Sequence, residues 1–160
     1  MAPDYVFRPM QPFDLQLIAR WLALPHVSTW WGDPAEQYAL VSGDLGEPAM
    51  DQYIVEAGGS PFAYLQCYDI TAWSSGFGVQ PPGTRGIDLF IGEAAMIGHG
   101  HGSALISSFV QERLRNGVPR IVTDPDPANA RAIRAYEKAG FARDRLIVTP
   151  DGPALLMVHD

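Results

Sequence analysis

The chain has 160 residues, of which 47% are hydrophobic and 18% are charged, and its formal net charge is −7. These proportions predict one folded domain over residues 1–160 and exclude a disordered chain. The acidic balance argues against a nucleic-acid partner, because proteins that bind nucleic acids present basic surfaces, and it suits a cationic substrate.

The sequence also indicates a compartment. No apolar stretch reaches the roughly 18 residues that a membrane-spanning helix needs, and the N-terminus lacks the pattern of a signal peptide. The single cysteine, Cys67, excludes an internal disulfide and is interpreted as a small core residue. We therefore expect a cytoplasmic protein with no membrane partner.

Hydropathy in the first half of the chain predicts a strand, a helix and a hairpin. The helix begins at Pro12, and Pro25 is expected to end it. The segment from residue 26 to residue 50 is predicted to be irregular, apart from one short helix. The expected elements are a strand at 5–8, helices at 12–24 and 34–40, and strands at 52–57 and 62–69.

The second half alternates strands and helices after a loop rich in Gly, Ser and Pro, which is expected to be exposed. The expected elements are this loop at 73–84, strands at 85–91 and 120–123, helices at 102–115 and 128–139, and a last hairpin at 141–148 and 153–159. The alternation predicts an α/β (α+β) chain but leaves several strand pairings open.

A glycine-rich turn, Ile97-Gly98-His99-Gly100-His101-Gly102-Ser103, opens the helix predicted at 102–115. Its glycines let a ligand approach the backbone, and the free N–H groups of a helix start bind anions such as a diphosphate. A nucleotide-hydrolase phosphate loop is set aside, because it requires Lys and Ser or Thr directly after the last glycine. A dinucleotide-binding fingerprint is set aside because its glycine spacing is wider.

A second segment, residues 123–141, contains the pattern Asn-x-x-Ala-x-x-x-Tyr-x-Lys-x-Gly-Phe. With the glycine turn, it resembles the acetyl-CoA-binding core of the GNAT superfamily of N-acetyltransferases. The resemblance implies a single domain with a mixed central sheet flanked by helices, acetyl-CoA as cosubstrate and no metal.

The resemblance also implies roles for residues of both segments. It places Tyr136 beside the coenzyme sulfur, where the phenol hydrogen-bonds the leaving thiolate. Ile97 stands where the superfamily usually has Gln or Arg, so we expect an adjusted affinity for the coenzyme. The implied coenzyme-binding residues are His99, Gly100, Gly102, Ser103 and Asn129. His99 and His101 are interpreted as turn residues rather than metal ligands.

Further segments resemble the aminoglycoside 6'-N-acetyltransferases, which transfer acetyl from acetyl-CoA to the 6'-amino group of these antibiotics and confer resistance. The segments are residues 26–32, 66–68, 85–88, 123–125, 132–141 and 149–154. The resemblance implies Asp88 as the group that accepts the amine proton. The implied substrate-binding residues are Trp31, Gln66, Tyr68, Asp88, Asp124 and Asp151. Carboxylates suit this substrate, because aminoglycosides are polycations.

One departure concerns the loop at 71–84, which contains no acidic residue, whereas the familiar enzymes of the group carry several there. We therefore leave the range of aminoglycosides open. The alternatives are a siderophore-biosynthesis amine acyltransferase of the same fold, an enzyme that acylates protein N-termini, and a noncatalytic acyl-CoA-binding sensor. The presence of both Asp88 and Tyr136 disfavours the sensor. Either a monomer or a homodimer is expected.

Overall fold

The computed structural model describes residues 4–73 and 76–160, so residues 74–75 of the loop at 73–84 lie outside the described residues. By its internal contacts the chain divides into two compact units, Met1–Gln66 with Leu89–His99 and Cys67–Asp88 with Gly100–Asp160. The described elements are β1 (Tyr5–Pro9), η1 (Pro12–Asp14), α1 (Leu15–Leu22), α2 (Pro25–Trp31), α3 (Pro34–Gly43), β2 (Met50–Ala57), β3 (Ser60–Asp69), η2 (Ile70–Ala72), β4 (Arg85–Ile91), η3 (Ala94–Met96), α4 (His101–Arg115), β5 (Ile121–Thr123), α5 (Ala130–Lys138), β6 (Ala142–Thr149) and β7 (Gly152–His159).

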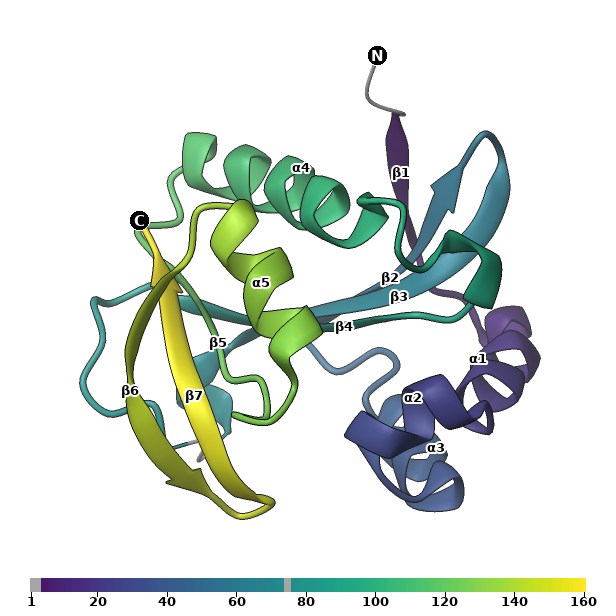
Figure 1. Ribbon diagram of the computed structural model, residues 1–160, viewed down its shortest axis with the longest axis horizontal. Helices are drawn as coiled ribbons and strands as arrows, with labels where there is room; N and C mark the ends of the chain where they lie inside the picture. Colours follow the sequence, from purple (N-terminus) through teal and green to yellow (C-terminus); the bar gives the residue numbers. More distant parts are fainter. Residues whose placement is uncertain (1–3, 74–75) are drawn as a thin grey trace. The chain divides into compact units, whose positions relative to one another are not determined.

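The described strands are hydrogen-bonded in the order β1-β2-β3-β4-β5-β7-β6. β4 and β5 run parallel, whereas β1 with β2, β5 with β7, and β6 with β7 are antiparallel. Helices alternate with these strands along the chain (Figure 1). The predicted α/β (α+β) class with a mixed sheet and flanking helices is therefore confirmed.

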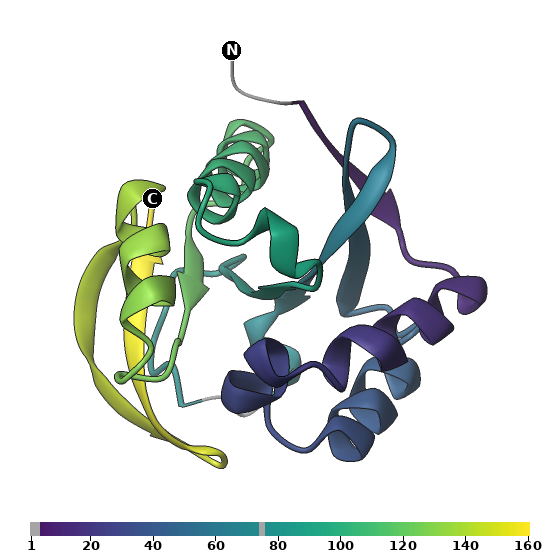
Figure 2. The ribbon, with the colours of Figure 1, turned by 45° about the vertical axis from the view of Figure 1, so that its right-hand side comes forward.

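The first unit is built around a core that three short helices share with its strands. α1, α2 and α3 lie side by side in both ribbon views (Figure 2). Burying their apolar faces stabilises these helices, which are too short to be stable alone. The core side chains are Met10, Ile18, Trp21, Leu22, Val27, Val41, Ile54, Tyr64 and Phe90.

The segment after Pro25 corrects the prediction of irregular structure. Pro25 does not end a helix but occupies the first turn of α2, where its missing N–H costs no hydrogen bond. α3 also begins with a proline, Pro34, and its cap Asp33 accepts a hydrogen bond from the backbone N–H of Glu36 at 3.0 Å. α3 extends past the predicted end at residue 40 to Gly43.

In the second unit α4 packs against α5 (Figure 1). α4 and α5 lie at the positions where the sequence predicts helices, and Cys67 is fully buried as predicted. The side chain of Asn129 caps α5 by accepting a hydrogen bond from the backbone N–H of Ala132 at 3.2 Å. No helix in the described part of the chain is long and apolar enough to cross a membrane.

The loop predicted to be exposed at 73–84 is only partly so. Phe77 and Thr84 are each 2% exposed. Gly76 and Gly78, on either side of Phe77, both have positive φ angles, 77° and 71°, and this backbone geometry turns the Phe77 ring inward. The loop is therefore tied down by an aromatic anchor that its Gly and Pro content did not predict.

Candidate active site

Two acidic residues of the second unit belong to neighbouring parallel strands, Asp88 within β4 and Asp124 directly after β5. Arg85 pairs with Ile121 and Gly86 with Val122, so the same register, continued past the end of β5, sets Asp124 opposite Asp88. Side chains at matching positions of adjacent strands point to the same face of a sheet. The register alone therefore brings these two carboxylates together.

In the acidic cluster, defined as Asp88, Asp124 and Asp151, the charges of the other two members act on Asp124. The pKa of Asp124 is raised from 3.8 to about 8, first by burial and then by the negative charges of Asp88 and Asp151. Burial and these neighbouring charges thus keep Asp124 protonated at neutral pH, and a cation bound beside them would oppose that effect. Such a site can bind a cationic group.

Asp151 comes from the hairpin turn between β6 and β7 and is exposed. Its backbone N–H donates to the hydroxyl of Thr149 at 3.2 Å, and that hydroxyl donates to the carbonyl of Gly152 at 2.9 Å. These bonds fix the turn, so Asp151 has a local structural function as well as a charge felt by Asp124.

Tyr136 of α5 lies beside the acidic cluster and is 6% exposed. Burial and the charges of Asp88 and Asp124 raise the pKa of this phenol, and a hydrogen bond with Thr123 partly opposes them. Tyr136 therefore keeps its proton throughout the neutral range and can serve as a hydrogen-bond donor, not as a base. Its ring also packs edge-on against Phe141, with centroids 5.3 Å apart.

Tyr68 of β3 forms an aromatic border to the cluster. Burial first, and then the charges of Asp88 and Asp124, raise its pKa well above the ordinary value. Its ring lies against Gly86, where a Cβ would come within 2.5 Å of the ring and 2.8 Å of the hydroxyl. Trp73 extends this border, because its ring meets Tyr68 edge-on at 5.7 Å.

The N-terminus of α4 has the geometry of an anion site. Gly100 is its N-cap with a φ of 82°, and no side chain caps the first turn. A Cβ at Gly100 would meet nothing within 4 Å, so the residue serves backbone conformation and leaves open space. His99 is exposed, and His101, Gly102 and Ser103 are half-buried. The Ser103 hydroxyl donates back to the carbonyl of Gly100 at 3.3 Å.

Two other predicted substrate-binding residues belong to the first unit. Trp31 is half-buried and meets the rings of Phe90 and Tyr64 edge-on, at 5.0 and 6.1 Å. Gln66 accepts a hydrogen bond from the Tyr64 hydroxyl at 2.8 Å. These contacts hold Trp31 and Gln66 in place within their own unit.

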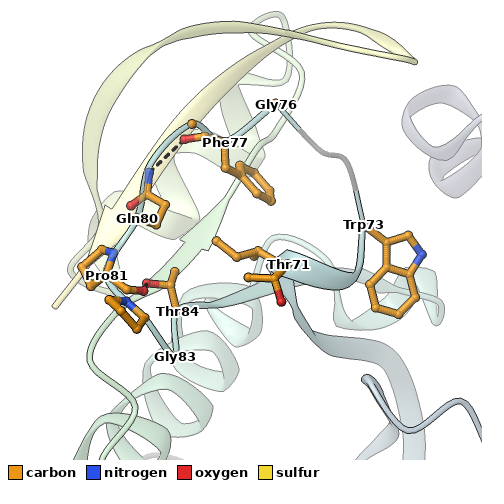
Figure 3. Close-up of a pocket in the computed structure, with 11 residues that line it drawn as sticks. Thr71, Trp73, Gly76, Phe77, Gln80, Pro81, Gly83 and Thr84 are labelled. Carbon is orange, nitrogen blue, oxygen red and sulfur yellow. Dashed lines mark hydrogen bonds between the residues drawn. The ribbon is translucent and has the colours of Figure 1, made fainter.

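Described residues of the loop at 71–84, together with Ile70, line an open pocket of about 250 Å³ in the second unit (Figure 3). None of its described lining residues is charged. Its wall is rigid around Phe77, whose carbonyl accepts hydrogen bonds from Gln80 at 2.9 Å and Arg145 at 3.2 Å. The described part of this loop therefore offers a neutral, partly apolar surface.

Sequence reasoning missed two residues of this site, Thr123 and Gly86. Both stand inside segments that carried the family resemblance, but neither has a chemically reactive group that would single it out. The available signal was the position of Thr123, which ends a buried apolar strand directly before Asp124. In the described residues, no group of three or more His, Cys, Asp or Glu side chains could hold a metal ion.

Residues 11–149 match the acetyltransferase (GNAT) domain family. The aminoglycoside N(6')-acetyltransferase type 1 of Klebsiella pneumoniae is 37% identical over 164 residues, which cover 95% of this chain and 81% of the relative. A kanamycin resistance protein of Rhizobium radiobacter is 49% identical over 79 residues, 49% of this chain and 73% of the relative.

Solved structures of related proteins are also similar to this chain. The aminoglycoside acetyltransferase AAC(6')-Ib in complex with coenzyme A and kanamycin has a TM-score of 0.87 at 37% identity, with 98% of this chain and 94% of that chain covered. Its complex with acetyl-CoA and paromomycin has a TM-score of 0.86 at the same identity, with 98% and 93% covered. This chain belongs to the GNAT acetyltransferase family.

Proposed function

We propose that this protein transfers an acetyl group from acetyl-CoA to the 6'-amino group of aminoglycosides and thereby confers resistance to them. The observation that carries the proposal is the acidic cluster of Asp88, Asp124 and Asp151, because acidic groups whose charges act at one site suit a polycationic ligand. Two relatives named for this activity or for kanamycin resistance support the choice of substrate.

Acetyl transfer to an amine requires a base, and we assign this role to Asp88. The 6'-amine arrives as an ammonium ion and attacks the thioester only after losing a proton. Asp88 accepts that proton, directly or through water. Asp124 and Asp151 then act as ligands to other ammonium groups of the antibiotic. As the carbon–nitrogen bond forms, the carbon–sulfur bond of the thioester breaks.

The departing thiolate needs a hydrogen-bond donor, and we assign this role to the buried phenol of Tyr136. A phenol that keeps its proton in the neutral range can stabilise the developing charge on sulfur by a hydrogen bond. The diphosphate of acetyl-CoA is placed at the start of α4, on His99, Gly100, Gly102 and Ser103. Asn129 contacts the arm of the coenzyme in addition to capping α5.

We assign recognition of the antibiotic beyond its reacting amine to the aromatic and polar side chains of Trp31, Gln66 and Tyr68. The described part of the loop at 71–84 has no acidic side chain, so it contributes no charge to the outer rings of an aminoglycoside. We expect a narrower range of antibiotics than an enzyme with acidic residues there would accept.

The direct test is to incubate the purified protein with acetyl-CoA and kanamycin and to follow release of the thiol. We expect thiol release that depends on kanamycin, together with a monoacetylated product at the 6' position. Asp88→Asn should lower kcat, whereas Asp124→Asn and Asp151→Asn should chiefly raise KM for kanamycin by roughly ten- to a hundredfold. A protein that acylates a siderophore-type amine but no aminoglycoside would overturn the assignment.

We also infer the domain organisation, the compartment and the oligomeric state of the protein. We assign residues 1–160 to one catalytic domain, because the family match at 11–149 takes in residues of both compact units. Use of acetyl-CoA favours the cytoplasm, where this thioester is available. Either a monomer or a homodimer fits the proposal, and light scattering on the purified protein separates the two.

A further inference from the structure

Three polar side chains of the first unit form one hydrogen-bonded chain that ends at Gln66. Nε2 of Gln52 donates to the carbonyl oxygen of Val41 at 2.9 Å and to the hydroxyl oxygen of Tyr64 at 3.0 Å. That hydroxyl donates to Oε1 of Gln66 at 2.8 Å. Gln52 and Tyr64 are buried, whereas Gln66 is half-buried. The chain thus runs from the core to a residue that we assign to the antibiotic.

The direction of these hydrogen bonds is set by the backbone carbonyl of Val41. Val41 lies in the last turn of α3, where carbonyls lack N–H partners within the helix, and a carbonyl only accepts. The amide of Gln52 therefore turns its nitrogen toward Val41. The same nitrogen donates to the hydroxyl oxygen of Tyr64, so the single hydroxyl proton points to Gln66. The atom of Gln66 that receives it is accordingly the amide oxygen.

The orientation of the Gln52 amide leaves one buried atom unpaired. Its Oε1 has no hydrogen-bond partner among the described residues. A buried, unpaired oxygen destabilises a fold, and an apolar side chain of similar size at position 52 would avoid this. Packing alone therefore does not explain an amide at this position. The two hydrogen bonds of its nitrogen do explain it, because they fix the direction of the Tyr64 proton.

The orientation of Gln66 determines which chemical group can bind to it. Its oxygen faces the buried hydroxyl of Tyr64, so its nitrogen lies on the other side of the amide group. An amide nitrogen only donates, and any group that contacts it must therefore be an acceptor. The ammonium groups of an aminoglycoside are donors, whereas the hydroxyl and ether oxygens of its rings accept. Gln66 held in this way favours an oxygen of the antibiotic over an ammonium group.

We propose that Tyr64, oriented by Gln52, is a positioning residue that makes Gln66 a hydrogen-bond donor to a hydroxyl or ether oxygen of the aminoglycoside. The inference rests on the proposed function and deepens it, because it names the chemical group that Gln66 recognises. Tyr64 is 0% exposed and so acts through its neighbours. Its ring also meets Trp31 edge-on at 6.1 Å, so one buried side chain supports two of the residues assigned to the antibiotic.

The first experiment removes the hydroxyl of Tyr64 and leaves its ring in place. We expect Tyr64→Phe to raise KM for kanamycin roughly tenfold with kcat nearly unchanged, because the Gln66 amide loses the bond that orients it. Tyr38→Phe is the matched control, since Tyr38 packs against the same core, and it should leave this KM unchanged. A Tyr64→Phe protein with the KM of that control would overturn the proposal. Thermal unfolding of both variants accounts for any loss of folded protein.

The second experiment asks whether Tyr64 acts through Gln66. Gln66→Leu alone should also raise KM for kanamycin roughly tenfold. In the Gln66→Leu background, Tyr64→Phe should change this KM by less than about twofold, because no amide is left to orient. A tenfold rise in that background as well would show a merely structural role for Tyr64 and overturn the inference.

The third experiment tests which group Gln66 presents. Gln66→Glu keeps the shape and an oxygen for Tyr64, but it replaces the amide nitrogen by a negatively charged acceptor. We expect KM for kanamycin to rise roughly tenfold, even though the new charge attracts a polycation. An unchanged or lower KM would show that an ammonium group lies there and would overturn the inference. Wild-type protein that acetylates no aminoglycoside would instead reject the proposed function, and the inference with it.

Discussion

At the scale of single residues, the site depends on a glycine that has no functional group to contribute. Gly86 lies directly beneath the ring of Tyr68, and a methyl group there would stand 2.5 Å from that ring. Tyr68 borders the acidic cluster, so any movement of its ring changes the walls of the site. Gly86 thus sets the position of an aromatic side chain by its lack of a side chain.

Gly86→Ala is therefore expected to destabilise the fold by about 1–3 kcal/mol, the usual range for overpacking, and to raise KM for the aminoglycoside. Both effects follow from displacement of the Tyr68 ring. Thermal unfolding and steady-state kinetics measure them. Gly43→Ala in α3 is the matched control, because a Cβ there would meet nothing within 4 Å. A Gly86→Ala protein as stable as that control would refute the packing argument.

Some residues of the candidate site could be identified from the sequence, and others could not. The three aspartates were identified by resemblance, and in the structure the charges of Asp88 and Asp151 act on Asp124. Their role toward a substrate stays a prediction. Thr123 was missed, because the hydrogen bond from its hydroxyl to the carbonyl of Ile87 depends on the pairing of β5 with β4. Hydropathy records that a residue is buried, but not the direction of its hydrogen bonds.

At the scale of elements, helices with periodic apolar faces were predicted well, whereas α2 was missed. α4 shows this clearly, since its buried residues Leu105, Ile106, Phe109 and Val110 repeat with the helical period. α2 has only seven residues and begins with Pro25. A proline predicts the end of one helix as readily as the first turn of the next, so tertiary packing decides between them.

The prediction at the scale of elements concerns the N-terminus of α4. Gly100→Asp would add a negative charge where the coenzyme diphosphate is proposed to lie, and we expect affinity for acetyl-CoA to fall at least tenfold. Gly100→Asn is the control, because it has nearly the same shape without the charge. Titration calorimetry with coenzyme A compares the two variants. If Asp and Asn weakened binding equally, the site would not be an anion site.

At the scale of the whole molecule, the acidic cluster opposes folding. In the folded protein Asp124 holds its proton up to about pH 8, whereas the ordinary value of 3.8 applies to the unfolded chain. Between these values the folded state binds more protons, so the free energy of unfolding falls as pH rises through this window and levels off above it. Ionisation of Asp124 in the folded protein is thus what lowers its stability as pH rises.

Asp124→Asn is accordingly expected to raise the melting temperature over that of wild type, and by more near pH 9 than near pH 5. The asparagine cannot ionise, so it removes the cost that wild type incurs as pH rises. Thermal unfolding at both pH values gives the comparison. Asp126→Asn, an exposed neighbour in the same segment, should show no such pH-dependent gain. A gain for Asp124→Asn that is independent of pH would contradict the raised pKa.

The parallel pairing of β4 and β5 has a consequence for how such a protein can change over time. Asp88 and Asp124 stand opposite each other because of the register of two adjacent strands, although η3, the glycine turn and α4 lie between them in sequence. Insertions or deletions in that intervening stretch leave the register of the strands intact. The part of the chain assigned to the coenzyme can therefore lengthen or shorten while the spacing of the two carboxylates is inherited unchanged.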